Sequence, residues 1–208
     1  LYQDFENRET LLELMRFKSL LKTGLISFKE YADGMKPDQK AIYFITGTEE
    51  AVLRNSPLLE LYRRKEIDVL IMDDEIDEIV IPSVQKYKDW DLKAVNRTDA
   101  ADDLKSDADK ANEERVKPLA ERIKKVLGER VKDVRASSRL SDSPSCIVAD
   151  ANDPTFQMQA MLRAMGQNAM EAKPVLEINP DHPIVQKLEL LTDDGRKVSL
   201  HLGGPEDE

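Results

Sequence analysis

Two short, continuous apolar runs stand out in the first half of the chain. AIYFITG (41–47) and DVLIM (68–72) are rich in β-branched and aromatic residues, which is typical of strands buried on both faces. Between them, Thr48 and Ser56-Pro57 each begin a short predicted helix. The order strand, helix, strand predicts a small α/β unit with a parallel sheet.

Other periodic segments surround this unit. NRETLLELMRFKSLLK (7–22) predicts an amphipathic helix, and SFKE (27–30) has the spacing of a capping box that opens a helix ending near Gly34. DDEIDEIVIPSV (73–84) predicts a further short helix, and WDLKAV (90–95) predicts an edge strand.

The composition changes at Asn96. Residues 96–117 contain almost no large apolar residue apart from Leu104 and Val116, so they predict a linker or a solvated helical connector. Helical spacing returns over residues 118–127. The first domain is therefore predicted to end near this change.

A second set of strands follows. They are predicted at residues 131–136, 145–149 and 175–178, and Asn179-Pro180-Asp181 begins a helix after the last of them. KVSLHL (197–202) alternates with period two and predicts one more strand.

The fold class that these patterns predict is α/β (α+β). A chain of 208 residues is long enough to bury two small cores without disulfide bonds. We expect two small two-layer or three-layer α/β domains, at residues 1–97 and 98–208, joined by the charged helical connector.

The most unusual segment is DPTFQMQAMLRAMGQNAM (153–170), which contains four of the seven methionines. Asp153 is a predicted N-cap and Gly166 a predicted C-terminal stop. An apolar stripe lies along one side of this predicted helix, which we call the methionine helix. The methionine stripe consists of Met158, Met161, Leu162 and Met165.

Two interpretations of the methionine stripe remain open. It either packs into a core or faces solvent and binds a partner, for which flexible thioether side chains are well suited. Phe156 and Ala160 lie on the opposite side, so the helix is apolar on two sides. Periodicity alone favours core packing, but if Phe156 and Ala160 pack on the protein's own sheet, the methionine stripe is left to bind a partner.

Charge and composition limit the choice of partner and compartment. A net charge of −10, from 31 basic and 41 acidic residues, argues against nucleic acid or an anionic membrane as the main partner. The single cysteine, Cys146, fits a reducing compartment. No apolar run approaches the roughly 18 residues of a membrane span and no signal peptide is found, so we expect a cytoplasmic protein. Because residue 1 is leucine, we expect a fragment of a longer protein.

The sequence contains no recognisable catalytic or metal-binding motif. No GxxxxGK[ST] or GxGxxG follows either strand of the first domain. His182 and His201 lack the spacing of a metal site or a triad, and His182 is expected to cap its helix locally.

Two polar regions could in principle form binding sites, but we interpret both as solvated surface. The acidic clusters at residues 73–78 and 102–103 lack the alternating oxygen ligands of a calcium loop, so we expect solvated faces. Residues 137–144 are expected to form a plain surface loop. We therefore predict no catalytic, cofactor-binding or metal-binding residue in this chain.

Four longer strings closely resemble the heat-shock protein 90 family of chaperones, and most of all its bacterial branch, high-temperature protein G. The resemblance covers residues 5–188 in continuous order. The strings are MKPDQKAIYFITG (35–47), SPLLELYRRKEIDVLIMDDEIDE (56–78), LGERVKDVRASSRLSDSPSCIV (127–148) and EINPDHPIVQKL (177–188).

The resemblance implies an ATP-driven dimeric clamp of three domains. This chain resembles the distal α/β part of the middle domain followed by most of the carboxy-terminal dimerisation domain. The segments that bind ATP and Mg in this family would precede Leu1, so the fragment is expected to have no ATPase activity of its own. Residues 189–208 do not match the family's dimerising helices, which leaves dimerisation by this piece open.

The resemblance also implies client-binding residues, because an amphipathic helix of the carboxy-terminal domain contributes to client binding in this family. The matching positions are Met158, Met161 and Leu162, to which the stripe adds Met165. Ile79 matches an exposed apolar position on the facing middle-domain surface.

The sequence therefore predicts a stress-response chaperone that binds unfolded or non-native client proteins. The alternative is a structural dimerisation and coupling module in which the methionine stripe is buried in an interface. A small-molecule enzyme has only the α/β architecture in its favour.

Overall fold

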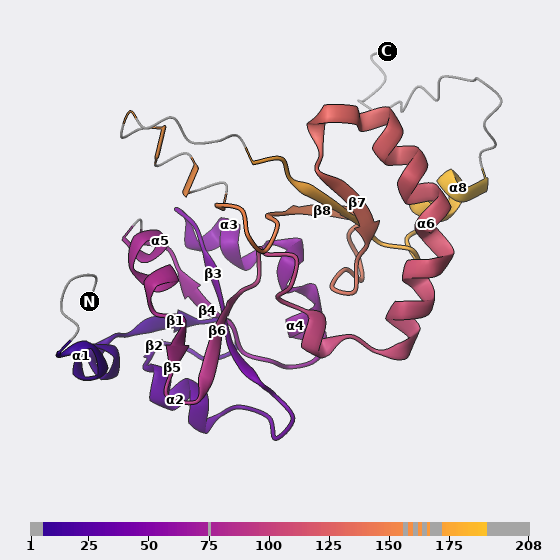
Figure 1. Cartoon of the computed structure of the whole chain (residues 1–208). Coiled ribbons are helices and arrows are strands. Elements are labelled where there is room, and N and C mark those ends of the chain that lie inside the picture. Colours follow the sequence, from indigo (N-terminus) through magenta and orange to yellow (C-terminus); the bar gives the residue numbers. More distant parts are fainter. Residues whose placement is uncertain are drawn as a thin grey trace, which may run out of the picture.

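The chain forms two β-sheets in the residues that the computed structural model describes (Figure 1). We call them the larger sheet and the smaller sheet. Helices flank both, so the predicted α/β class is confirmed. The predicted strand at 197–202 and much of the methionine helix lie outside the described residues, which are 6–74, 76–155, 158–159, 162–163, 166 and 172–190.

In the described part of the chain, the larger sheet has the strand order β2-β1-β4-β3-β6-β5. β3 pairs in parallel with β4 and β6, whereas β1, β2 and β5 pair antiparallel. The two apolar runs thus form adjacent strands as predicted, but the sheet is mixed. Its strands are β1 (Phe17–Ser19), β2 (Leu25–Ile26), β3 (Ala41–Thr46), β4 (Leu70–Met72), β5 (Lys86–Tyr87) and β6 (Trp90–Ala94).

β3 is buried along its whole length because helices cover both faces of the larger sheet. Tyr43 and Ile45 join one buried cluster with residues of α3 and α4, whereas Ile42 and Phe44 join another with residues of α1 and α2. The larger sheet is therefore the middle of three layers. The helices of this part are α1 (Arg8–Leu14), α2 (Phe28–Asp33), α3 (Glu50–Arg54), η1 (Pro57–Leu59), α4 (Glu60–Arg64), α5 (Asp77–Val80) and η2 (Ile81–Ser83).

Two of the predicted caps are present, whereas the helix predicted from Thr48 has Glu49 at its N-cap position and no side-chain cap. Ser27 and Glu30 form the predicted capping box of α2, which ends at Gly34. The Ser56 side chain accepts a hydrogen bond from the backbone N–H of Leu58 at the start of η1. Each contact satisfies a backbone donor that the first helical turn leaves unpaired.

Two predictions in this part were wrong. The helix predicted over 7–22 ends at Leu14, and Phe17–Ser19 pairs with β4 instead. Pairing with a buried strand outweighs helical periodicity here. The predicted edge strand β6 is internal, because β5 pairs beyond it. β5 has only two residues, which are too few to show the alternation of polar and apolar positions that marks a strand.

The smaller sheet has the order β7-β9-β8 in the described residues, with β7 parallel and β8 antiparallel to β9. α6 packs on one face through Leu119 and Ala120, and Val185 of α8 joins the same cluster. In Figure 1, α6 and α8 lie on the side away from the larger sheet. The elements of this part are η3 (Asp102–Leu104), α6 (Asp107–Leu127), η4 (Gly128–Arg130), β7 (Asp133–Ala136), β8 (Ser145–Val148), β9 (Val175–Ile178) and α8 (Pro183–Leu190).

The connector differs from its prediction in two ways. Residues 107–117 are helical, as expected, but α6 continues through Pro118 without a break. Residues 95–101 are not a solvated linker, because Val95, Ala100 and Ala101 are buried. Small apolar side chains in this stretch pack tightly although none of them is large.

The two sheets share one buried cluster at what we call the junction. Cys146, Val148 and Val175 of the smaller sheet pack in the same cluster as Tyr43 and Tyr62. The backbone is also joined there, since the N–H of residue 98 donates to the carbonyl of residue 149 at 3.0 Å. The smaller sheet is therefore held between α6 and the α4 side of the larger sheet.

Candidate functional site

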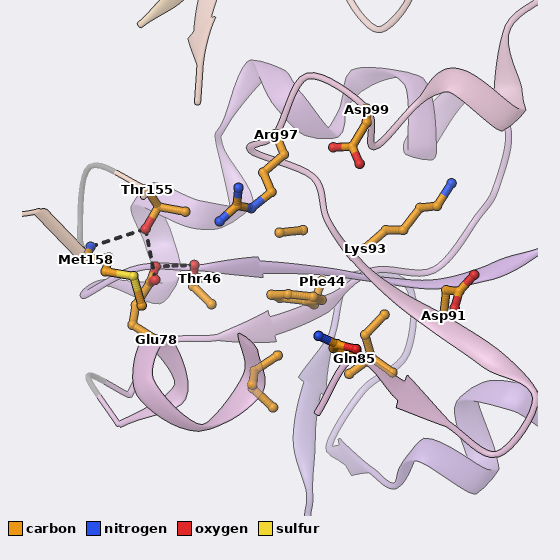
Figure 2. A pocket seen from close by; sticks show the side chains of 13 residues that line it. Phe44, Thr46, Glu78, Gln85, Asp91, Lys93, Arg97, Asp99, Thr155 and Met158 are labelled. Carbon is orange, nitrogen blue, oxygen red and sulfur yellow. Dashed lines mark hydrogen bonds between the residues drawn. The ribbon is translucent and has the colours of Figure 1, made fainter. Parts of the chain in front are cut away.

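A pocket of about 410 Å³, which we call the junction pocket, opens on the Phe44 side of the larger sheet, where Thr155 and Met158 approach it from the smaller-sheet side (Figure 2). Ligand-binding pockets have volumes of roughly 300–1,000 Å³. The carboxylates of Glu78, Asp91 and Asp99 also line it. Lys93 and Arg97 line it too, so the pocket combines an apolar surface with side chains of both charges. The apolar lining comes from Phe44, Ile81, Leu92, Ala94 and Met158.

Glu78, on α5, links the two sides of the pocket. Its side chain is 7% exposed. One carboxylate oxygen accepts a short hydrogen bond from the hydroxyl of Thr46 at the end of β3, and the other accepts from Thr155 Oγ1 at 3.0 Å. Figure 2 shows Glu78 between these two threonines. A buried carboxylate needs such donors, so Glu78 fixes residue 155 against the larger sheet.

Thr155 also positions Met158. Thr155 Oγ1 accepts a hydrogen bond from the backbone N–H of Met158 at 3.2 Å, which is the geometry of an N-cap. The cap is therefore Thr155, two residues after the predicted Asp153. Gly166 has a φ of +71°, as a glycine at the predicted helix stop requires.

Arg97 holds the loop that leads into this segment. Its Nη1 donates to the carbonyls of Asp150, Ala151 and Asp153 at 3.2, 2.7 and 2.9 Å. Lys132 also pairs with Asp150 and Asp153. The wall of the pocket that carries Thr155 and Met158 is consequently anchored by side-chain contacts rather than by a strand.

Asp77 lies next to Glu78 and is 9% exposed. Burial, together with the nearby charge of Asp74, raises the pKa of Asp77 to about 6. A carboxylate in this position is destabilised by its surroundings. The acidic segment beside the pocket therefore contains a group that titrates near neutral pH.

The structure brings some of the predicted site residues together. Met158 is half-buried and lines the pocket. Ile79 is half-buried on α5, adjacent to the pocket residue Glu78, and Leu162 is half-buried one helical turn after Met158. Met161 and Met165 lie outside the described residues, as do Phe156 and Ala160. The role of all five predicted client-binding positions stays a prediction.

Sequence reasoning missed the buried carboxylates. Asp77 and Glu78 were expected on a solvated face, but both are buried. Glu78 follows Ile76 and Asp77 on a four-residue helix, which is too short for periodicity to show its buried side. The loop over residues 137–144 was also expected at the surface, yet Arg139 is 1% exposed.

Other polar groups show no sign of chemistry. Burial raises the pKa of the Cys146 thiol to about 12, which suppresses the reactive thiolate. His182 Nδ1 accepts from the backbone N–H of Ile184, which confirms its predicted local role. Among the residues that the structure describes, no cluster of His, Cys, Asp or Glu side chains suits a metal ion. No described helix is long and apolar enough to cross a membrane.

Comparison with known proteins places the chain in a family. Residues 1–199 match the family model described as "Hsp90 protein". The chain is 53% identical over 197 residues to the chaperone protein HtpG of Treponema denticola, covering 90% of this chain and 31% of that protein.

Two further relatives agree with this match. The chaperone protein HtpG of Treponema pallidum is 51% identical over 203 residues, covering 93% of this chain and 32% of that protein. The protein of the same name from Wolinella succinogenes is 50% identical over 202 residues, covering 94% and 32%. The chain spans about a third of the length of these curated relatives. It belongs to the Hsp90 protein family.

Proposed function

We propose that this chain is the client-binding part of a molecular chaperone of the heat-shock protein 90 type. It would capture unfolded or non-native proteins during stress and release them in a cycle driven by ATP. The observation that carries this proposal is the junction pocket, where Met158 meets the apolar side chains of the larger sheet beside Glu78.

The pocket suits weak and reversible capture. Phe44, Leu92 and Met158 present apolar surface there, and burying one apolar side chain contributes about 1.5–3 kcal/mol. The flexible thioether of Met158 can adapt to different side chains. A few such contacts, less the cost of ordering the client, give modest affinity.

The charges around the pocket favour particular client segments. The carboxylates of Glu78, Asp91 and Asp99 outnumber the two cations, Lys93 and Arg97, in its lining, and the chain carries a net charge of −10. An acidic client segment would be repelled, whereas an apolar segment flanked by lysine or arginine would be attracted. Such segments are the clients that we propose for this site.

ATP and Mg²⁺ are implied by the proposed cycle, but the residues described here do not fit them. No described cluster suits a metal ion. The pocket's two cations are already engaged, Lys93 by Asp103 and Arg97 by three backbone carbonyls, and the carboxylates of Glu78, Asp91 and Asp99 would repel a triphosphate. We propose that the nucleotide binds in another part of the full-length protein. This chain would supply the surface on which the ATPase cycle acts.

The remaining assignments are also proposals. We assign residues 1–97 to the distal middle domain, and residues 98–208 to the connector helix and the carboxy-terminal domain. The full-length protein would be a cytoplasmic homodimer. The resemblance to bacterial chaperones supports these assignments.

The test is suppression of client aggregation by the full-length protein. Met158→Asp places a charge in the apolar lining and should abolish most of the suppression. Met35→Asp is the matched control, because Met35 is another half-buried methionine, follows α2 and is not among the residues that line the pocket. Circular dichroism would confirm that both variants fold.

Unchanged suppression by folded Met158→Asp would show that the pocket is not the client site. If that variant instead lost a concentration-dependent dimer in light scattering while still suppressing aggregation, Met158 would belong to an interface. That outcome would favour the coupling module over the client site.

A further inference from the structure

The loop after β7 surrounds a carboxylate from a helix that packs on the larger sheet. Glu60, the first residue of α4, projects into it. Its Oε2 accepts from the backbone N–H groups of Ser141, Asp142 and Ser143 at 2.5, 2.9 and 3.4 Å. The hydroxyl of Ser143 donates to Oε1 at 2.5 Å. Successive amides that converge on one anion form a nest, and we call residues 141–143 the amide nest.

The amide nest is shaped by its own sheet. Asn179 follows β9 and is 3% exposed. Its Nδ2 donates to the carbonyls of Ser141 and Ser143, both at 3.1 Å, and its backbone N–H donates to the carbonyl of Pro144 at 2.9 Å. With the carbonyls held from behind, the amides point toward Glu60. The nest is therefore formed without help from the larger sheet.

The donors to Glu60 are neutral. Burial acts to raise the pKa of Glu60, but the Ser143 hydroxyl and the three amides outweigh it, so the pKa is lowered overall. In the described part of the chain no lysine or arginine forms an ion pair with Glu60. The nest thus favours the charged carboxylate through hydrogen bonds alone.

This contact and the pocket lie on different faces of the larger sheet, but both join it to the smaller-sheet side. Leu61 and Tyr62 follow Glu60 on α4 and belong to the buried cluster shared with Leu140 and Cys146. The pocket takes Thr155 from the smaller-sheet side and Glu78 from the larger-sheet side. A rotation of one sheet against the other would therefore change the pocket.

We propose that Glu60 and the amide nest form a catch that fixes the smaller sheet against the larger sheet and so sets the shape of the junction pocket. Glu60 is then a positioning residue that acts on clients without touching them. This role rests on the proposed function for its effect on clients, but the catch itself does not.

The catch is tested first without a client, by hydrogen exchange in full-length Glu60→Ala. Losing several charge-assisted hydrogen bonds should speed exchange of the 141–143 amides about tenfold or more. Acetate should enter the vacated nest and slow exchange again, whereas chloride at the same ionic strength should not. Glu121→Ala, at an exposed position on α6, is the control.

Ser143→Ala provides an independent variant, because it removes one donor and leaves the carboxylate in place. It should speed exchange less than Glu60→Ala does. Exchange in Glu60→Ala that matches the wild type, or that is fast but indifferent to acetate, would overturn the catch.

The effect on the pocket is tested by binding of an apolar peptide flanked by lysines. Glu60→Ala should weaken binding several-fold, and acetate should restore it. A loosened loop with unchanged peptide affinity would overturn the link between catch and pocket. If the wild type did not bind the peptide, the proposed function would fail, and hydrogen exchange alone would still decide on the catch.

Discussion

The carboxylates of Glu60 and Glu177 both lie at the junction, but different kinds of groups stabilise their charges. Glu177, on β9, is 1% exposed and is paired with Arg135 at 2.7 Å and with Arg139 at 2.8 Å. Glu60 is only partly buried and is held by amides and hydroxyls. A fully buried charge needs an opposite charge, whereas a carboxylate near solvent needs only good donors.

The two glutamates therefore have different roles. Glu177 mainly stabilises the fold, whereas Glu60 mainly orients one sheet against the other. Both arginine partners of Glu177 belong to the smaller-sheet side, although Arg139 also donates to the carbonyls of Val95 and Arg97. Glu177 thus supports mainly the interior of its own sheet. Glu60 instead reaches from one sheet to the other. Substitutions at the two positions should have different consequences.

The largest effect is expected at Glu177. Glu177→Ala leaves Arg139 buried without its partner and should lower the free energy of unfolding by about 3–5 kcal/mol. Urea unfolding measures this directly. The double variant Arg139→Met, Glu177→Leu should recover much of the loss, because the fully buried charge of Arg139 is then removed too, and the partly exposed Arg135 keeps its hydrogen bond to the carbonyl of Thr98. A single variant as stable as the wild type would contradict the comparison.

Substituting Asp77 should raise the free energy of unfolding instead of lowering it. The pKa of Asp77 is about 6 in the folded chain and 3.8 ordinarily, so folding takes up a proton between these values. The contribution of Asp77 to stability should therefore rise as the pH falls from 7 to 4, whereas carboxylates with a lowered pKa, such as Glu60, act in the opposite direction. Asp77→Asn should therefore add about 1–3 kcal/mol at pH 7–8 and lose this advantage near pH 4. Thermal unfolding across this range tests the sign, and an advantage that grew toward pH 4 would refute it.

Substituting Thr155 should lower the free energy of unfolding by less than substituting Glu177 does. Thr155→Val removes a hydroxyl that donates to Glu78 and accepts from the N–H of Met158. We expect a loss of about 1–2 kcal/mol. Thr155→Ser keeps the hydroxyl and should lose much less. Equal losses in the two variants, measured by urea unfolding, would show that the methyl group contributes as much as the hydrogen bonds and would contradict this prediction.

The smallest effect on global stability is expected at Glu60. Glu60→Gln keeps the size of the side chain, so the free energy of unfolding should fall by only about 1 kcal/mol. Local exchange at 141–143 should nevertheless rise. A loss as large as that of Glu177→Ala would mean that Glu60 supports the core, and the distinction between stability and orientation would fail.

Much of the fold could be predicted because its signals are local. The buried run at 41–47 and the capping box at Ser27 can each be read from fewer than ten residues, and both were confirmed. The strands β1 and β5 could not, since partners elsewhere in the chain determine them. Two or three residues carry too little periodicity.

The candidate site was less predictable than the fold. The stripe pointed to Met158, which does line the pocket. Its polar residues are linked over long sequence distances, with 77 positions between Glu78 and Thr155 and 81 between Glu60 and Ser141. No spacing rule connects residues so far apart. An acid that is buried by a distant segment looks like any surface acid in the sequence.

The amide nest has a consequence for which mutations the chain can tolerate. Backbone N–H groups are present whatever the side chain, so Ser141 and Asp142 can be replaced by most residues other than proline without losing their amide donors to Glu60. The specific demands fall on Asn179, which holds the carbonyls, and on Ser143, whose hydroxyl donates at 2.5 Å, whereas the longer hydroxyl contact of Ser141, at 3.3 Å, contributes less. Most residues of this loop can therefore be substituted while the contact between the two sheets is kept.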